Sequence, residues 1–197
     1  MKMKLKSSVM AGVVFAGLSA APVFAAQSDQ AIKVTIKDIR VEDSVYTPYY
    51  EVQTEQDHQQ GAAARWIRLG VYFTTEGGWI DELDVTQMAT KKTDGDTPGV
   101  VLAETVHYIN LEPGDHYVYV YLHPSYVKRY EIDEFDLDSA AVISVGGKEM
   151  ARRESAKHAE AGWSARADDG MEKGYLLNHA ETPFWFINYD FKEIIRR

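Results

Sequence analysis

The sequence predicts an all-β protein, an antiparallel β-sandwich of seven or eight strands with a short C-terminal helical extension. Short segments of alternating apolar and polar residues recur between turn-forming residues, which is typical of strands in a two-sheet sandwich. Alternating strand and helix units are absent, which argues against a parallel α/β fold. With 45% hydrophobic and 12% aromatic residues in 197, the chain can bury one core.

The first 25 residues are interpreted as an export signal. Three lysines precede an uncharged apolar run, and small residues precede Gln27. This pattern predicts cleavage after Ala25 or Ala26. A retained anchor is the alternative, although Pro22 and the many alanines make the segment a poor membrane span. The predicted domains are therefore a signal peptide (1–25), a sandwich (26–155), and a C-terminal extension (156–197) packing on or beside the sandwich.

Charge and cysteine content limit the partners and the chemistry. Removal of the signal takes away three lysines and no acid, so the formal net charge changes from -9 to -12. An acidic surface repels phosphate, so we expect no nucleic acid partner, no membrane contact except through an uncleaved signal, and attraction of a basic protein. The same acidity also keeps an exported protein soluble. The absence of cysteine excludes disulfides, thiolate catalysis and Cys-based metal sites.

The first predicted strand covers 32–41, where apolar and polar residues alternate. Asp38 breaks the phase of this alternation, which predicts a β-bulge. A second short strand is predicted from Val45 to Gln53, at an edge because Pro48 interrupts it. A polar loop, 54–64, follows.

The next two strands are predicted to form a hairpin across the turn Glu76–Gly78. The first strand, 65–75, has two distinct faces. One carries Ile67, Leu69, Val71 and Phe73, and the other carries Trp66, Arg68, Gly70 and Tyr72. The second strand covers 79–90.

The remaining elements are shorter. An exposed loop (91–99) precedes strands at 100–109 and 117–122. A strand at 140–145 is expected to turn at Gly146–Gly147 and to pair with 148–154. Helical segments are expected near 155–161 and 189–195.

The stretch NLEPGDHYVYVYLHP, 110–124, contains a tight turn followed by alternating tyrosines. In a two-sheet sandwich the chain must cross between sheets, and a tyrosine can lock this corner. Its hydroxyl then bonds to main chain a few residues upstream while its ring packs into the core. Leu111, Pro113, Gly114 and Tyr117 have the spacing of this device in fibronectin type III and related immunoglobulin-like domains. This resemblance predicts an immunoglobulin-like sandwich with Tyr117 as a structural residue.

Tyr119 and Tyr121 share the strand face of Tyr117, while Val118, Val120 and Leu122 fill the other face. The simpler interpretation is that the tyrosines continue a core or half-exposed sheet face. The alternative is an exposed aromatic stripe on which a sugar could stack.

A second resemblance lies in GYLLNHAETPFWFINYDF, 174–191. This segment resembles the end of immunoglobulin-like proteins exported by Verrucomicrobia, and the whole chain is similar to the pilus-associated immunoglobulin-like proteins of Akkermansia. The resemblance implies a non-enzymatic surface or periplasmic domain that self-associates and works beside type IV pilus components. The signal lacks the cleavage site of a true pilin, which argues against a filament subunit of that type.

No catalytic constellation, cofactor motif or metal motif stands out. None of the six histidines forms an H-E-x-x-H pair. The acidic run 131–138 could offer oxygen ligands to calcium, but it lacks the EF-hand spacing. A solvated edge with Ile132, Phe135 and Leu137 pointing inward is the simpler interpretation. We find no nucleophile elbow, Walker loop or dinucleotide motif, so we expect no enzyme and no cofactor.

The leading expectation is an exported interaction or assembly module that binds a protein of the cell envelope or a second copy of itself. Candidate interaction residues are Trp66, Trp79, Tyr119, Tyr121, Pro183, Phe184 and Trp185. The alternatives are a carbohydrate-binding module, with the same rings as stacking platforms, and an unfamiliar hydrolase. Deletion of Gly174–Arg197 is expected to abolish self-association or partner capture while leaving the sandwich folded.

Overall fold

The protein is described from a computed structural model, and the described residues are 31–48, 63–91, 100–155, 157, 159–167, 171–185 and 194–196. The predicted signal peptide lies outside these residues. So do part of the predicted strand 45–53 and most of the predicted helix 189–195.

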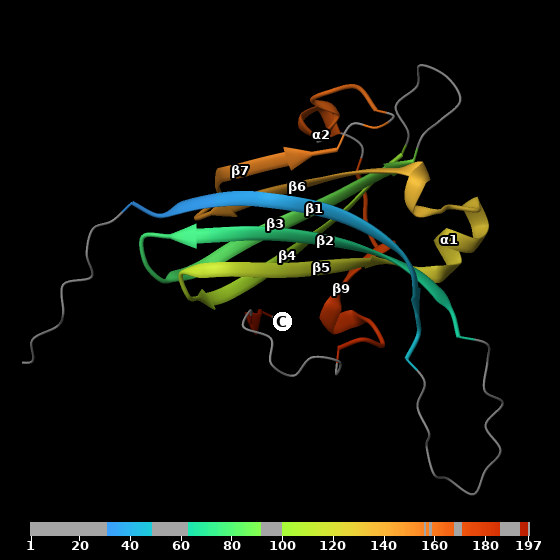
Figure 1. The fold of residues 1–197 in the computed structure, drawn as a ribbon, viewed down its shortest axis with the longest axis horizontal. Coiled ribbons are helices and arrows are strands. Elements are labelled where there is room, and N and C mark those ends of the chain that lie inside the picture. Colours follow the sequence, from blue (N-terminus) through green and yellow to red (C-terminus); the bar gives the residue numbers. More distant parts are fainter. Residues whose placement is uncertain are drawn as a thin grey trace, which may run out of the picture.

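Two facing sheets, almost entirely antiparallel, form a β-sandwich (Figure 1). Sheet A contains, in order, β1 (Lys33–Tyr46), β2 (Arg65–Glu76), β5 (Gly114–Leu122) and β9 (Leu176–Asn178). Sheet B contains β10 (Ile194–Ile195), β4 (Val101–Leu111), β3 (Ile80–Lys91), β6 (Leu137–Val145) and β7 (Lys148–Glu154). The short β8 (Met171–Glu172) pairs in parallel with β4. The predicted all-β sandwich is confirmed: β1 to β7 are the long strands, and three short ones bring the number in the described residues to ten.

In the part of the chain that the structure describes, four short helices lie outside the sheets: α1 (Pro124–Tyr130), the 3-10 helix η1 (Glu134–Asp136), α2 (Trp163–Arg166) and the 3-10 helix η3 (His179–Glu181). The His123 side chain starts α1 by accepting a hydrogen bond from the Ser125 N–H at 3.1 Å. The helix ends where Glu131 adopts a left-handed conformation. The helical prediction near 155–161 is wrong, because among the described residues α2 begins only at Trp163. Of the predicted helix 189–195, only the last two residues, Ile194–Ile195, are described, and they form a strand.

The strand β1 is continuous to Tyr46, so the prediction of a separate strand starting at Val45 is wrong. The predicted bulge is present, since the register with β2 shifts between Ile36 and Asp38. The Asp38 carboxylate accepts the Ile39 N–H at 3.0 Å, which satisfies a backbone donor at this bulge.

The predicted hairpin at 65–90 is wrong, because β2 and β3 belong to different sheets. Glu76–Trp79 carries the chain across the sandwich instead, and the positive φ of Gly78, 141°, suits this sharp turn. Alternation in a strand shows which side chains face the core, but it is the same whether the next strand lies beside it or opposite. The hairpin of β6 and β7 around Gly146–Gly147 is confirmed.

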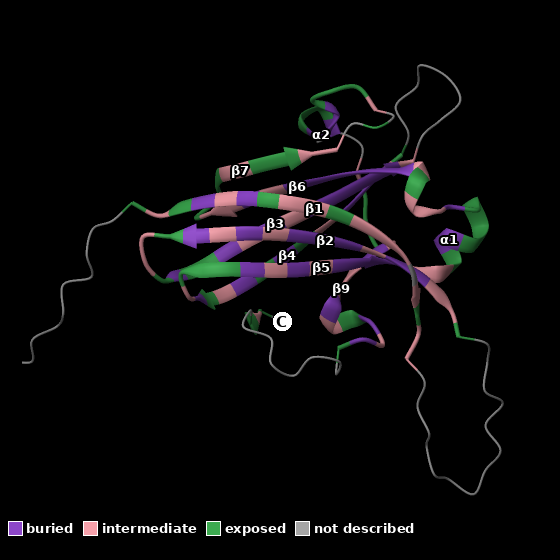
Figure 2. Cartoon of the chain, viewed as in Figure 1, coloured by how far each residue is buried: buried purple, intermediate pink, exposed green. Residues whose placement is uncertain are grey.

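Both sheets contribute to one core. Alternate residues of β2 and β5 are buried, as the coloured bands in Figure 2 show. The largest fully buried side chains are Phe73, Ile67, Leu69, Ile80, Leu83, Leu102, Leu111, Leu122, Ile132, Leu137, Ile143 and Leu176.

The C-terminal extension adds to both sheets. Its strand β9 pairs with β5, while β8 and β10 pair with β4. Leu176 of β9 has no exposed surface and belongs to the main core. The burial of Leu176 predicts that deletion of Gly174–Arg197 opens the core, which argues against the expectation that the sandwich stays folded without this segment.

The helix α2 covers part of the outer face of sheet B. Trp163 packs there with Met88, Ala103 and Ala140 in a second apolar cluster. Its indole N–H donates to the Ser155 carbonyl at 3.1 Å. Within the described residues, no helix has the length and apolar character needed to cross a membrane.

Candidate interaction surface

The outer face of sheet A carries the tyrosines of the sequence motif. Arg68, Gly70 and Tyr72 of β2 lie opposite Tyr121, Tyr119 and Tyr117 of β5, respectively. Facing residues in an antiparallel pair share one side of the sheet, so these side chains form a continuous surface. We call the half-buried Arg68, Tyr72, Tyr117 and Tyr119 the tyrosine face.

Tyr117 is held on this face and does not enter the core, so its predicted role as the corner tyrosine is wrong. Its hydroxyl donates to Glu42 Oε1 of β1 at 3.0 Å, not to upstream main chain. Its ring lies directly on Gly70: a Cβ at that glycine would sit 2.5 Å from the Tyr117 oxygen. The absence of a side chain at Gly70 thus lets the ring lie flat across the sheet.

The crossover between β4 and β5 is locked by His116, one residue earlier. The His116 ring is 2% exposed and stacks on Phe73, with centroids 4.9 Å apart. Its Nε2–H donates to the Glu112 carbonyl at 3.0 Å and lies 3.1 Å from Thr75 Oγ1. The predicted turn at Leu111–Gly114 does cross the sandwich, with Leu111 fully buried and Pro113 and Gly114 exposed.

Arg68 links the tyrosine face to β1. Its guanidinium lies 4.8 Å from the centroid of the Tyr119 ring and pairs with Glu42. Burial alone would raise the pKa of Glu42, but the hydrogen bonds from Arg68 and Tyr117 outweigh it, and the pKa is below its ordinary value. Glu42 therefore stays ionised and orients both partners.

One end of the face is covered. Phe184 stacks on Tyr121 with ring centroids 4.6 Å apart, and it meets Trp66 in an edge-to-face contact with ring centroids 5.6 Å apart. The Trp66 indole N–H donates to Thr47 Oγ1 at 3.0 Å. All three rings are 5% exposed or less, so they form a small core of their own and are not available to a partner.

The other predicted interaction residues are scattered. Trp185 is 53% exposed beside the half-buried Pro183, next to the covered end of the tyrosine face. Trp79 is 56% exposed, but it lies at the β2–β3 crossing near the other end of the sandwich. Of the predicted set, only Tyr119 belongs to the tyrosine face.

The rings of the tyrosine face do not form a flat row. Tyr117 and Tyr119 meet at 66°, with centroids 4.5 Å apart, and Tyr72 meets Tyr117 at 76°. Edge-to-face contacts of this kind stabilise the rings against one another. They also occupy ring faces that a sugar would need, and Arg68 covers Tyr119.

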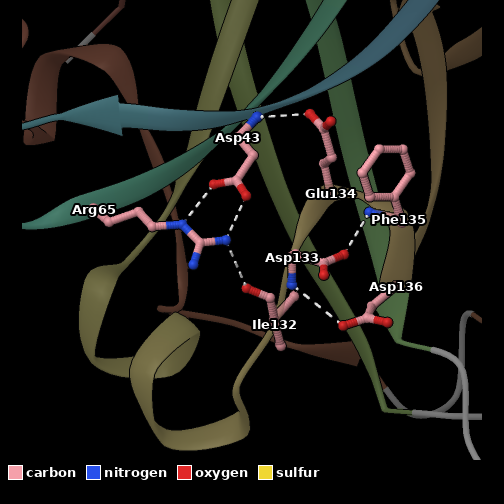
Figure 3. A network of polar contacts seen from close by, with 7 residues as sticks. All are labelled: Asp43, Arg65, Ile132, Asp133, Glu134, Phe135 and Asp136. Carbon is pink, nitrogen blue, oxygen red and sulfur yellow. Dashed lines mark hydrogen bonds and ion pairs between the residues drawn. The ribbon is translucent and has the colours of Figure 1, made fainter.

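The acidic run around η1 serves the fold (Figure 3). Glu134 accepts the Asp43 N–H at 3.1 Å, and Asp133 caps η1 by accepting the Phe135 N–H at 2.8 Å. Asp138 accepts the Lys157 N–H at 2.7 Å. Among the residues that the structure describes, no group of three or more acidic or histidine side chains could hold a metal ion. Ile132 and Leu137 point inward as predicted, but Phe135 is 69% exposed, so the inward prediction for Phe135 is wrong.

Arg68, Glu42, Gly70 and His116 were not predicted as site or corner residues. Arg68 and Gly70 were placed on the correct strand face, and His116 falls in phase with the buried Val118 and Val120. This alternation is the sequence pattern that could have predicted a buried His116. No local sequence pattern could have predicted the role of Glu42, because 75 residues separate it from Tyr117.

We expect Tyr117 and Tyr121 to resist ionisation in alkali. Burial raises the pKa of Tyr121 to about 12, and burial followed by the neighbouring Glu42 raises the pKa of Tyr117 further. Because the folded state favours the protonated phenol, this stabilisation is complete below the unfolded pKa of about 10 and is lost as pH rises through the folded values. Tyrosinate absorbance should show both phenols still protonated near pH 11 in the native protein but not in urea. Coincident native and denatured titration curves would contradict this.

The two facing sheets, with the β4–β5 crossover that links them, define an immunoglobulin-like β-sandwich. A protein-family model matches residues 25–197. The chain therefore belongs to the family that this model describes. The predicted resemblance to a pilus-associated immunoglobulin-like protein of Akkermansia is confirmed.

A crystal structure of a protein from Akkermansia muciniphila is similar to most of this chain. The two chains are 25% identical, the match covers 86% of this chain and 95% of that chain, and the TM-score is 0.69. No curated protein matches the sequence.

Proposed function

We propose that this protein is an exported, non-enzymatic interaction or assembly module of the bacterial cell envelope. We further propose that a protein partner binds the tyrosine face. The similarity to a pilus-associated protein over most of both chains supports a role beside pilus components. The net charge of -9 favours a partner with a basic surface.

The tyrosine face is the observation that carries this proposal. Tyrosine and arginine are enriched in protein interfaces and among the residues that dominate binding energy. Here Tyr72, Tyr117, Tyr119 and Arg68 are half-buried on paired strands and fixed by mutual packing. Their side chains therefore lose little conformational entropy on binding, which favours affinity.

The two alternatives have less support. The rings of the tyrosine face meet edge to face, so they offer no flat platform for a sugar. A hydrolase requires an acid and a base that converge in a cleft. Glu131 and Asp133 line the pocket beside α1, but the Asp133 carboxylate is engaged as the cap of η1.

Site-specific photo-crosslinking tests the proposal. A benzoylphenylalanine replaces Tyr72 in the exported protein, and the native cell envelope is irradiated. We expect a discrete covalent adduct with a protein of defined mass. The matched control carries the same crosslinker at Thr105, which is exposed on the outer face of sheet B. No adduct from position 72, or the same adducts from both positions, would refute the tyrosine face as the binding surface.

A further inference from the structure

A short segment covers part of the outer face of sheet B. It contains α2 and is described at residues 159–167, which we call the strap. Figure 1 shows α2 beside β7. Trp163 of the strap packs on Met88, Ala103 and Ala140 of the sheet. Most other side chains of the strap are exposed, so polar contacts must contribute to its attachment.

The Asp138 carboxylate of β6 fastens the chain at the start of the strap. Asp138 is 1% exposed, and its two oxygens accept hydrogen bonds from different backbone donors. Oδ1 accepts the Lys157 N–H at 2.7 Å, and Oδ2 accepts the Ala159 N–H at 2.5 Å. Because each oxygen faces an N–H donor, a proton on either one would place an O–H group against a donor.

The Glu154 carboxylate of β7 holds α2 in the same way. Its Oε1 accepts the Gly162 N–H, while its Oε2 accepts the Ser164 hydroxyl at 2.8 Å and the Ser164 N–H at 3.3 Å. Burial alone would raise the pKa of Glu154, but these hydrogen bonds outweigh it, and the pKa lies below its ordinary value. The strap is therefore bound by the ionised form of this side chain.

Arg152 is the cation that supports this arrangement. Its positive charge helps to lower the pKa of Glu154, and its guanidinium donates to the Ser164 hydroxyl at 3.2 Å. Other charged side chains on this face and in the strap form the pairs Glu149–Arg152, Glu160–Arg166 and Asp84–His107. Protonation of Asp138 and Glu154 is therefore the change in charge that acts directly on the backbone donors of the strap.

We infer that the strap is an acid-sensitive cover, which is released from sheet B while the rest of the sandwich stays folded. Protonation of Asp138 and Glu154 turns acceptors into hydroxyl groups and weakens several charge-assisted hydrogen bonds together. The strands beneath do not depend on these bonds, because β3 and β6 are each paired on both sides and contribute to the main core. Local release should therefore precede global unfolding.

The direction of the pH dependence follows from Glu154. Its folded pKa lies below the ordinary value of 4.5, so its contribution is present above that pH and is lost as pH falls through the folded pKa. Release uncovers Met88, Ala103 and Ala140, which are 3% exposed or less beneath the strap. Sheet B thereby gains an apolar outer face in acid. The inference concerns the sheet opposite the tyrosine face and does not depend on the proposed function.

The indole N–H signals in NMR spectra of the exported protein test this inference, because two buried indoles serve as matched probes. Trp163 of the strap donates to the Ser155 carbonyl at 3.1 Å, and Trp66 of sheet A donates to Thr47 Oγ1 at 3.0 Å. As the pH falls from about 7 to about 3, the Trp163 signal should reach its unfolded position at a higher pH than the Trp66 signal. Trp163→Phe assigns the signal. Simultaneous loss of both signals, or earlier loss of the Trp66 signal, would overturn the inference.

Neutral variants separate the two carboxylates from a general effect of acid. Asp138→Asn and Glu154→Gln each keep one acceptor oxygen where the carboxylate has two. Each should raise the midpoint of the Trp163 transition by about one pH unit, which is the equivalent of a tenfold change in a one-proton equilibrium. The double variant should show a released Trp163 signal and a native Trp66 signal at neutral pH.

The matched control is Glu160→Gln, which neutralises an exposed carboxylate within the strap itself. Glu160 pairs with Arg166 at the surface, so this variant should leave the midpoint unchanged. The Trp66 signal verifies that each variant is folded, and the two single variants decide if the double variant is not. Unchanged midpoints in both single variants, or an equal shift in Glu160→Gln, would also overturn the inference.

Discussion

Leu176→Ala should lower the free energy of unfolding by about 3 kcal/mol, within the range of about 2–5 kcal/mol for buried leucines. Leu176 has no exposed surface, and it pairs with Leu122 at the end of β5. The substitution removes apolar contacts and leaves a cavity where the C-terminal extension enters the core. Because 1 kcal/mol changes the melting temperature of a domain of this size by about 2–4 °C, a fall of roughly 6–12 °C should accompany it. Urea and thermal unfolding measure both quantities.

The matched control for this prediction is Leu177→Ala, the same substitution one residue later. Leu177 is half-buried and packs on the outer cluster of Trp66, Tyr121 and Phe184. Leu177→Ala should lower the free energy of unfolding by only about 1 kcal/mol, because less buried apolar surface is lost. Equal losses for the two variants would show that β9 is only attached to the surface of the sandwich.

His116→Ala should lower the free energy of unfolding by about 3 kcal/mol, because it leaves a cavity and removes a buried hydrogen bond. His116→Phe separates these two effects. Phenylalanine preserves the stacking on Phe73 but leaves the Glu112 carbonyl without the ring donor, so we expect a loss of about 1–2 kcal/mol. Urea unfolding of both variants checks the order of these losses.

Tyr117→Phe is the control for the corner. It removes only the hydroxyl that donates to the half-exposed Glu42, so the free energy of unfolding should fall by only about 0.5 kcal/mol. If Tyr117→Phe were as destabilising as His116→Phe, the tyrosine would have a larger part in the crossover than its position on the outer face implies. The comparison therefore decides which of two adjacent residues stabilises the turn.

Much of the local structure could be predicted from the sequence. Alternation placed Ile67 and Phe73 on the core face of β2 and Trp66 and Tyr72 on the opposite face, and the break at Asp38 marked the bulge. These predictions succeed because side chains of a strand alternate between two faces and because burial follows hydrophobicity.

Strand pairing could not be predicted in the same way. Glu76–Gly78 has the composition of a hairpin turn, yet β2 pairs with β1 and β5. The tyrosine spacing near Leu111 matched a known corner, but His116 faces the core and Tyr117 does not. Both errors arise because a local pattern does not specify the sheet, or the side of it, on which a residue finds its partner.

The sequence by itself determined the class of fold, the faces of the principal strands and the absence of cysteine chemistry. The reason is that hydrophobic period and composition act locally. Tertiary structure alone decided which rings are buried, which charges pair across β1 and β2, and which carboxylates of sheet B hold the strap. Those features depend on contacts between residues far apart in the chain, whose positions are set only when both sheets close around the core.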